Sequence, residues 1–189
     1  MKDCLYFFIS NAPFSKKGFS ESLSSFDIPF RITYDSETRG YIEAPSKFGI
    51  LLAPSFFTIH DDLGVTITLL EAPKRSPLSE KLLVEALSYF PNQVVCITDL
   101  LLKEFSFGNF TSIPLLKNEF KDIPHELMLT AGAYLRSNMN ASLTAELLYI
   151  HRNTFNYRLN AFVEQTGLDI REYHNALLLE FYFQLCSRN

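Results

Sequence analysis

The last third of the chain contains four consecutive helical patterns, and the turn residues between them predict where each helix begins and ends. The first starts near Pro124, which suits the opening turn of a helix. Ser142 is a natural N-cap for a second, short helix. A third is predicted over residues 152–166, where Gly167 would stop it, and a fourth, strongly apolar one over residues 172–186. Such a succession of short helices predicts an all-α domain.

The first half has a different pattern, in which short apolar segments alternate with turn residues. Strict alternation of apolar and polar residues, typical of a half-buried strand, occurs at residues 30–34 and 65–69. Short apolar runs give three more strand candidates, at residues 5–9, 49–53 and 94–98, and helices are predicted at residues 16–25 and 79–89. The predicted fold class is therefore α+β, with an α+β domain over residues 1–110 and an all-α domain over residues 124–189. The segment between them is predicted to be loop-like or weakly helical.

Composition limits the class of protein. Hydrophobic residues make up 47% of the chain and charged residues 20%, which is typical of a soluble globular protein. The formal net charge of -4 argues against a protein that coats nucleic acid by bulk electrostatics, so any contact with DNA must come from a local surface. The apolar run at residues 5–9 is too short for a signal-peptide core or a membrane span.

The three cysteines, Cys4, Cys96 and Cys186, are far apart and show no metal-ligand spacing. Reduced, buried thiols are the simpler interpretation. Together with the absence of a targeting segment, they predict a reducing, cytoplasmic location without membrane association.

Residues 142–160 have the spacing of a helix-turn-helix, in which a short helix, a tight turn at residues 149–151 and a longer helix follow one another. Ala145 is small at the position where the two helices would cross, and Leu148 and Ile150 would fill the turn. Four apolar residues fall on one face of the longer helix and predict its buried side: Phe155, Leu159, Phe162 and Val163.

The opposite face of the longer helix gathers polar groups that can bind DNA. Arg152 can donate two hydrogen bonds to guanine or bind a phosphate, and Asn153 can pair with adenine. Arg158 lies to one side and is better placed for a phosphate. From the residues alone, an ordinary solvated face fits this strip as well. The predicted DNA-binding residues are Ser142, His151, Arg152, Asn153, Thr154, Asn156, Tyr157, Arg158 and Asn160.

Residues 151–159, with the sequence HRNTFNYRL, and residues 164–169, with the sequence EQTGLD, together resemble the C-terminal helix-turn-helix of PucR/CdaR regulators. That family usually has His-Arg-Asn-Thr-Leu-x-Tyr-Arg-Leu followed by Thr-Gly-Leu-Asp. The resemblance covers about the last third of the chain. It implies a transcription regulator that binds double-stranded DNA, since known members control catabolic operons.

The chain departs from this family in its charge. Asn160 and Ala161 stand where members usually carry basic residues, and residues 124–189 contain five Lys or Arg against six Asp or Glu. A homodimer would double the phosphate contacts across two half-sites and offset this weak electrostatic attraction. The same acidic balance supports an alternative, a protein-interaction module with a helix-turn-helix fold that no longer binds DNA.

The first half resembles, weakly, the degenerate diguanylate-cyclase-like domain that precedes the helix-turn-helix in many relatives. The matching segments are residues 79–89, 94–98 and 99–102. No Gly-Gly-Asp/Glu-Glu-Phe sequence occurs, so no nucleotide-cyclising activity is predicted, and a ligand-sensing or dimerising role is expected by analogy, with the effector unidentified. The segment His60-Asp61-Asp62 before Gly64 is predicted to be a polar turn. Because no nucleophile with a base, phosphate loop or metal set is recognised, neither an enzyme nor a cofactor is expected.

Overall fold

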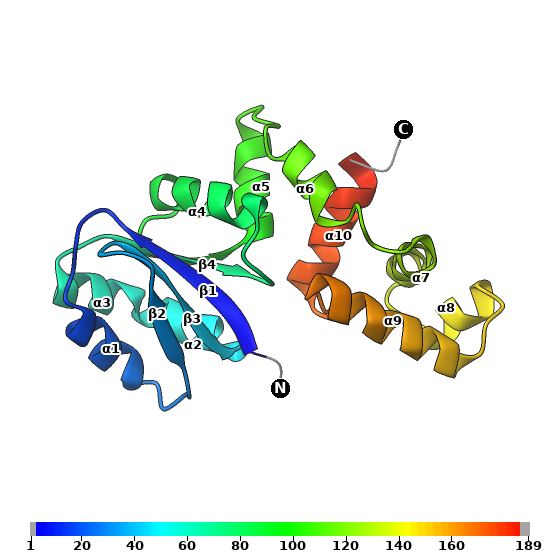
Figure 1. The fold of residues 1–189 in the computed structure, drawn as a ribbon, viewed down its shortest axis with the longest axis horizontal. Helices are drawn as coiled ribbons and strands as arrows, with labels where there is room; N and C mark the ends of the chain where they lie inside the picture. The colour runs from blue at the N-terminus through cyan, green and yellow to red at the C-terminus, as the bar shows by residue number, and fades with distance from the viewer. Residues whose placement is uncertain (1–2, 186–189) are drawn as a thin grey trace. The chain divides into compact units, whose positions relative to one another are not determined.

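The computed structural model describes residues 3–185, which fall into two compact units with the boundary between Asn109 and Phe110. The first unit is a sheet with helices on both faces, and the second contains helices alone (Figure 1). The fold class is therefore α+β, as predicted. Over the described residues, no helix combines the length and apolar character needed to cross a membrane.

Five strands form one mixed sheet in the first unit, in the order β2-β3-β1-β4-β5. Neighbouring strands are antiparallel except for β4 and β5, which pair in parallel. The central strand β1 carries residue pairs with both β3 and β4, such as Phe7 opposite Tyr41 and Leu70. The strands are β1 (Asp3–Ser10), β2 (Arg31–Tyr34), β3 (Arg39–Pro45), β4 (Ile67–Ala72) and β5 (Val94–Cys96).

The helices of the first unit cover the two faces of this sheet unequally. α1 (Lys16–Ser24), α2 (Lys47–Leu52) and α3 (Phe56–Leu63) share one core with β1, β3 and β4. On the opposite face, α4 (Pro77–Tyr89) packs on β1 and β4, and α5 (Ile97–Ser106) packs beside it (Figure 1).

The strands show why both faces need helices. Successive side chains point to opposite faces, so Phe8 enters the core with α1 to α3, whereas Phe7 faces the other side. In β4 the four successive residues Ile67, Thr68, Leu69 and Leu70 are all buried. A run buried on both faces is typical of a strand covered on both sides, and periodicity alone does not distinguish it from a buried helix.

Two predictions for this unit are wrong. The apolar run at residues 49–53 lies mostly in helix α2, where Phe48 and Leu52 enter the core one turn apart. The segment around His60 is the last turn of α3 and not a loop, and the chain turns only at Gly64, whose φ of 65° gives the left-handed end of the helix.

The second unit contains α6 (Ile113–Glu119), α7 (His125–Arg136), α8 (Ala141–Leu147), α9 (Arg152–Thr166) and α10 (Tyr173–Leu185). The boundaries of α9 and its stop at Gly167, with φ 78°, are confirmed. Pro124 is the residue before α7 rather than part of its first turn. α6 lies in the segment predicted as loop-like or weakly helical, and Cys186 lies outside the described residues.

Candidate nucleic-acid interface

Helix α8 begins at a different cap from the one predicted. Asn140, not Ser142, is the N-cap: its side-chain oxygen accepts hydrogen bonds from the backbone N–H groups of Ser142 and Leu143, both at 3.1 Å. The backbone N–H of Ser142, a predicted DNA-binding residue, is therefore bonded within the protein. The Ser142 side chain itself is exposed.

The turn between α8 and α9 is closed by two backbone hydrogen bonds. The N–H of Tyr149 donates to Glu146 O and that of Ile150 to Ala145 O, both at 3.0 Å. This pair of bonds defines a Schellman turn, in which the residue after the C-cap is left-handed and usually glycine. Here that residue is Tyr149, with φ 53°. For a residue with a Cβ, this conformation costs about 1–2 kcal/mol.

His151 caps the start of α9. Its Nδ1 accepts a hydrogen bond from the Asn153 N–H at 3.2 Å, and its carbonyl accepts the first helical bond, from Phe155 N–H at 3.1 Å. An imidazole that accepts at Nδ1 carries its hydrogen on Nε2. The predicted tight turn at residues 149–151 is therefore confirmed, and it leads directly into the segment predicted to read DNA.

The apolar face of α9 packs against α7 and α8. Phe155 and Phe162 are fully buried, and the Phe155 ring lies 5.4 Å from the ring of Tyr134 on α7, centroid to centroid. Ala145 of α8 is buried where the two helices meet. The buried face is confirmed for Phe155, Leu159 and Phe162, while Val163 is half-buried at its border.

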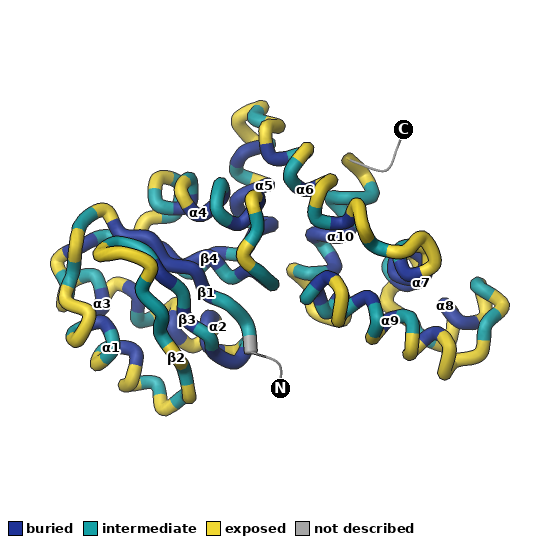
Figure 2. The backbone as a smooth tube through the Cα atoms, viewed as in Figure 1, coloured by how far each residue is buried: buried dark blue, intermediate teal, exposed yellow. Residues whose placement is uncertain are grey.

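The polar side chains of α9 lie on the exposed side of the helix. Exposed and buried residues alternate along α9 in Figure 2. The Tyr157 side chain is 74% exposed. Every residue predicted for this strip is exposed, as is the cap residue before it: His151, Arg152, Asn153, Thr154, Asn156, Tyr157 and Asn160.

Arg158 differs from these residues. Its Nη2 lies 3.0 Å from Glu126 Oε2 on α7, and its side chain is 24% exposed. The guanidinium therefore already has a carboxylate partner in the same unit. A phosphate contact by Arg158, which the sequence favoured, would compete with this ion pair.

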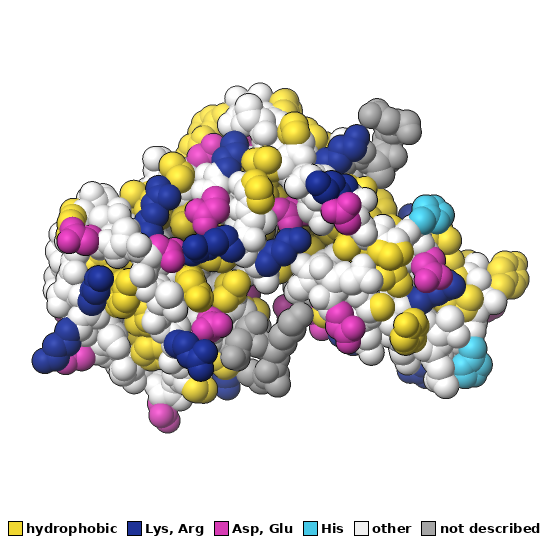
Figure 3. Space-filling model, viewed as in Figure 1, with side chains coloured by type: hydrophobic (Ala, Val, Ile, Leu, Met, Phe, Trp, Pro, Cys, Tyr) yellow, Lys and Arg dark blue, Asp and Glu magenta, His cyan; other side chains and the backbone are white. Residues whose placement is uncertain are grey.

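The second unit presents no continuous basic stripe on the face visible in Figure 3, where basic and acidic side chains lie next to one another. Arg171 is paired with Asp169, with Nε 2.6 Å from Oδ1, and this hydrogen bond raises the pKa of the Arg171 guanidinium. Burial raises the pKa of the Tyr134 phenol, so its hydroxyl stays protonated. The surface therefore offers hydrogen-bond donors and acceptors more than net positive charge.

Residues 127–185, which contain most of α7 and all of α8, α9 and α10, match the family model described as the PucR C-terminal helix-turn-helix domain. This part of the chain is a PucR-type helix-turn-helix domain. The resemblance seen in the HRNTFNYRL and TGLD segments is thereby confirmed.

Relatives of the PucR-type domain include named bacterial regulators. The chain is 41% identical over 64 residues to the uncharacterized protein YxkF of Bacillus subtilis, covering 34% of this chain and 20% of that protein. It is 40% identical to the carbohydrate diacid regulator of Escherichia coli, over 41% of this chain and 20% of the relative. It is 36% identical to the proline-responsive transcriptional activator PutR of Bacillus subtilis, over 40% and 18%.

These matches span about a fifth of each relative's length. Among solved structures, the regulator of polyketide synthase expression from Bifidobacterium adolescentis aligns with 97% of this chain and 80% of its own. Its TM-score is 0.48 and its sequence identity 16%.

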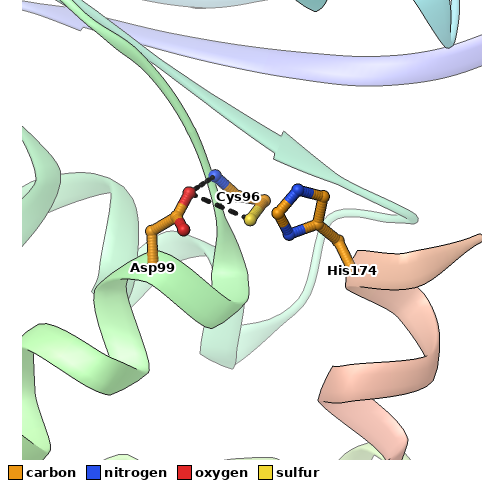
Figure 4. Close-up of side chains that lie close together, drawn as sticks. All are labelled: Cys96, Asp99 and His174. Carbon is orange, nitrogen blue, oxygen red and sulfur yellow. Dashed lines mark hydrogen bonds between the residues drawn. The ribbon is translucent and has the colours of Figure 1, made fainter.

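Outside the PucR-type domain, Cys96 and Asp99 form a polar contact at the start of α5. The Asp99 carboxylate accepts hydrogen bonds from the Cys96 N–H at 2.9 Å and from its thiol at 3.0 Å (Figure 4). Burial, followed by the bond to Asp99, raises the pKa of the Cys96 thiol to about 12. Both side chains therefore cap α5, and this thiol is not a nucleophile at neutral pH. His174, which Figure 4 also labels, comes from α10 of the second unit.

Cys4 is half-buried like Cys96, so neither of the two described cysteines is fully buried as predicted. Sequence reasoning also overlooked Tyr149, whose side chain is 97% exposed beside the start of α9. The signal available was a large aromatic residue at a position where the helix-turn-helix pattern requires a left-handed backbone.

Proposed function

We propose that the PucR-type domain binds double-stranded DNA in a sequence-specific way, with the first half of α9 in the major groove. The observation that carries this proposal is the separation of faces on α9, where Phe155 and Leu159 are buried and the polar residues from Arg152 to Asn160, apart from Arg158, are exposed. An arginine and an asparagine at the start of such a helix have the donors and acceptors that distinguish base pairs. The named relatives, a diacid regulator and a proline-responsive activator, support a regulatory role.

We further propose that the protein binds as a homodimer. A single domain with few basic residues makes few phosphate contacts, and a second copy doubles them across two half-sites. This function would place the protein in the bacterial cytoplasm. The first unit would then either bind an effector or hold the two copies together. The names of the relatives do not identify the effector of this chain.

A selection from random-sequence duplex DNA with the purified protein tests the proposal. We expect enrichment of a palindromic pair of half-sites. The double variant Arg152→Ala/Asn153→Ala should then bind the selected duplex at least about 30-fold more weakly, because each bidentate base contact contributes about 1–3 kcal/mol. Its thermal stability should hardly change, since both side chains are exposed.

A matched control removes the same two residue types elsewhere, as Arg31→Ala/Asn118→Ala on exposed positions of β2 and α6. This control should bind like the wild type. Unchanged binding by the Arg152→Ala/Asn153→Ala variant would show that α9 is not the reading helix.

A second candidate function is a protein-interaction module. The observation that favours it is the apolar outer side of α8, where Leu143 and Leu147, one turn apart, are 41% and 57% exposed. This second candidate would be favoured if the DNA selection enriches no sequence and the protein binds no duplex DNA at either low or high salt concentration.

A further inference from the structure

Tyr149 occupies a backbone position that suits glycine. Its φ of 53° is in the left-handed region, and the two hydrogen bonds of the Schellman turn, from Tyr149 N–H and Ile150 N–H, require that conformation. Tyrosine is among the residues for which a left-handed backbone is uncommon. The fold therefore fixes the backbone here, but it does not require this side chain.

Two other helix ends in the same unit show which residue types occupy the left-handed position after a helix. α7 ends in the same pair of hydrogen bonds, and the residue in the position of Tyr149 is Asn138, with φ 52°, followed by Met139, which is left-handed as well, with φ 58°. α9 ends at Gly167, with φ 78°. Asparagine and glycine are the residues that adopt this conformation at least cost. At the first residue after the C-cap, the turn into α9 is therefore the exception among these three helix ends.

Packing does not explain the exception. The Tyr149 side chain is 97% exposed, more than any other large hydrophobic or aromatic side chain among the described residues. A ring so exposed gains almost nothing from burial, so nothing inside the protein offsets the strain of its backbone. Residues with a strained backbone whose cost is not offset by local packing are often found at functional sites.

The position of Tyr149 indicates what its side chain could contact. It lies two residues before His151, the cap of α9, and three before Arg152, at the end of the helix that enters the groove under our proposed function. Groups around this end of a recognition helix approach the sugar–phosphate backbone, and tyrosine hydroxyls are among the usual phosphate donors. An aromatic ring with a polar tip also suits a surface that is apolar at the deoxyribose and charged at the phosphate.

We propose that Tyr149 is a DNA-backbone contact, with its ring against a deoxyribose and its hydroxyl donating to a phosphate oxygen next to the bases read by Arg152 and Asn153. This inference rests on the proposed DNA-binding function. It assigns to Tyr149 a positioning role, because a backbone contact sets the register of α9 in the groove and carries no sequence information itself.

Two variants test the proposal on the full chain, with the duplex enriched in the selection as the probe. Tyr149→Gly relieves the left-handed backbone, so its melting temperature should rise by about 2–5 °C while its affinity falls by roughly 10-fold or more. Tyr149→Phe keeps the ring and should melt like the wild type, but bind roughly 3- to 10-fold more weakly through loss of the hydrogen bond. A purely structural role for Tyr149 would not make stability and affinity change in opposite directions.

Each Tyr149 variant should lose affinity by the same factor for the selected duplex and for duplexes with single base changes, because the contact is to the DNA backbone. Asn138→Gly, the same kind of backbone change at the equivalent turn of α7, is the matched control and should keep wild-type affinity. Wild-type affinity in both Tyr149 variants, with Arg152→Ala/Asn153→Ala still defective, would overturn this inference alone. A wild-type protein that binds no duplex would overturn the proposed function and this inference together.

Discussion

At the scale of single residues, Lys81 joins two carboxylates on neighbouring helices. Its Nζ lies 2.8 Å from Glu85 Oε1, one turn along α4, and also contacts the Glu104 carboxylate on α5. Glu104 is fully buried. Burial is the main cause that raises the pKa of the Glu85 carboxyl above its usual value of 4.5, and the hydrogen bond with Glu104 adds to it. The cluster therefore holds more negative charge than one lysine compensates.

This raised pKa predicts how stability depends on pH. A carboxyl whose pKa is higher in the folded state stabilises the fold below about pH 4.5, and this stabilisation is lost as the pH rises through the folded value. Glu85→Gln should therefore match the wild type in urea unfolding near pH 4 and become the more stable protein toward pH 7. Glu21→Gln, on the exposed surface of α1, reports the effect of removing one carboxylate in general. A difference between Glu85→Gln and wild type that stays constant over this range would contradict the prediction.

At the scale of elements, the helices of the second unit were predictable because local residues terminate them. Gly167 ends α9, and the spacing of Phe155, Leu159 and Phe162 identified its buried face. The sheet was less predictable. Strand β3 was not predicted because its inward positions include the small residues Gly40 and Ala44, which hide the alternation. Gly40 is small because a Cβ there would lie 2.5 Å from Cζ of Phe8 on the neighbouring strand, a contact that is invisible in the sequence.

The sequence allowed us to predict which residues of the candidate site are exposed, but not which hydrogen bonds and ion pairs its residues form. The spacing of apolar and polar residues in α9 indicated which side chains face outward, because helical periodicity separates them from the core. The ion pair of Arg158 with Glu126 and the capping of α8 by Asn140 depend on which of several nearby polar residues is closest in space. Periodicity does not contain that information.

The capping assignment for α8 makes a prediction at this scale. Asn140→Ala should lower the stability of the PucR-type domain by about 1 kcal/mol, because two N–H groups at the start of α8 lose their acceptor. Ser142→Ala, the residue that the sequence favoured as the cap, should change stability by less than about 0.5 kcal/mol. Equilibrium urea unfolding of both variants measures the difference, and the reverse order of effects would restore Ser142 as the cap.

At the scale of the whole molecule, the net charge of -4 and the local pairing of arginines limit how strongly DNA can attract this protein. In the described part of the PucR-type domain, Arg158 and Arg171 have carboxylate partners, whereas Arg136 and Arg152 form no ion pair. Under the proposed function, the attraction would therefore come from few cations per copy. Specific hydrogen bonds would then contribute a large share of the affinity.

This balance predicts a shallow dependence of binding on salt. Each neutralised phosphate contributes about -0.9 to the slope of log K against log salt concentration, so a dimer with two such arginines per copy should give a slope of about -4 or shallower. Fluorescence anisotropy with the selected duplex between about 50 and 200 mM salt measures it. A slope near -10 would mean that cations outside this domain carry the binding.

The separation of faces on α9 also bears on how such a protein can change during evolution. The side chains that hold the helix in place, such as Phe155 and Leu159, are not the ones that face outward, such as Arg152, Asn153 and Asn156. Substitutions at the outward positions leave the interior undisturbed, so under the proposed function a lineage could acquire a new operator without first repairing its fold. The same independence makes these positions the natural ones to randomise in the laboratory when a regulator with a different target is wanted.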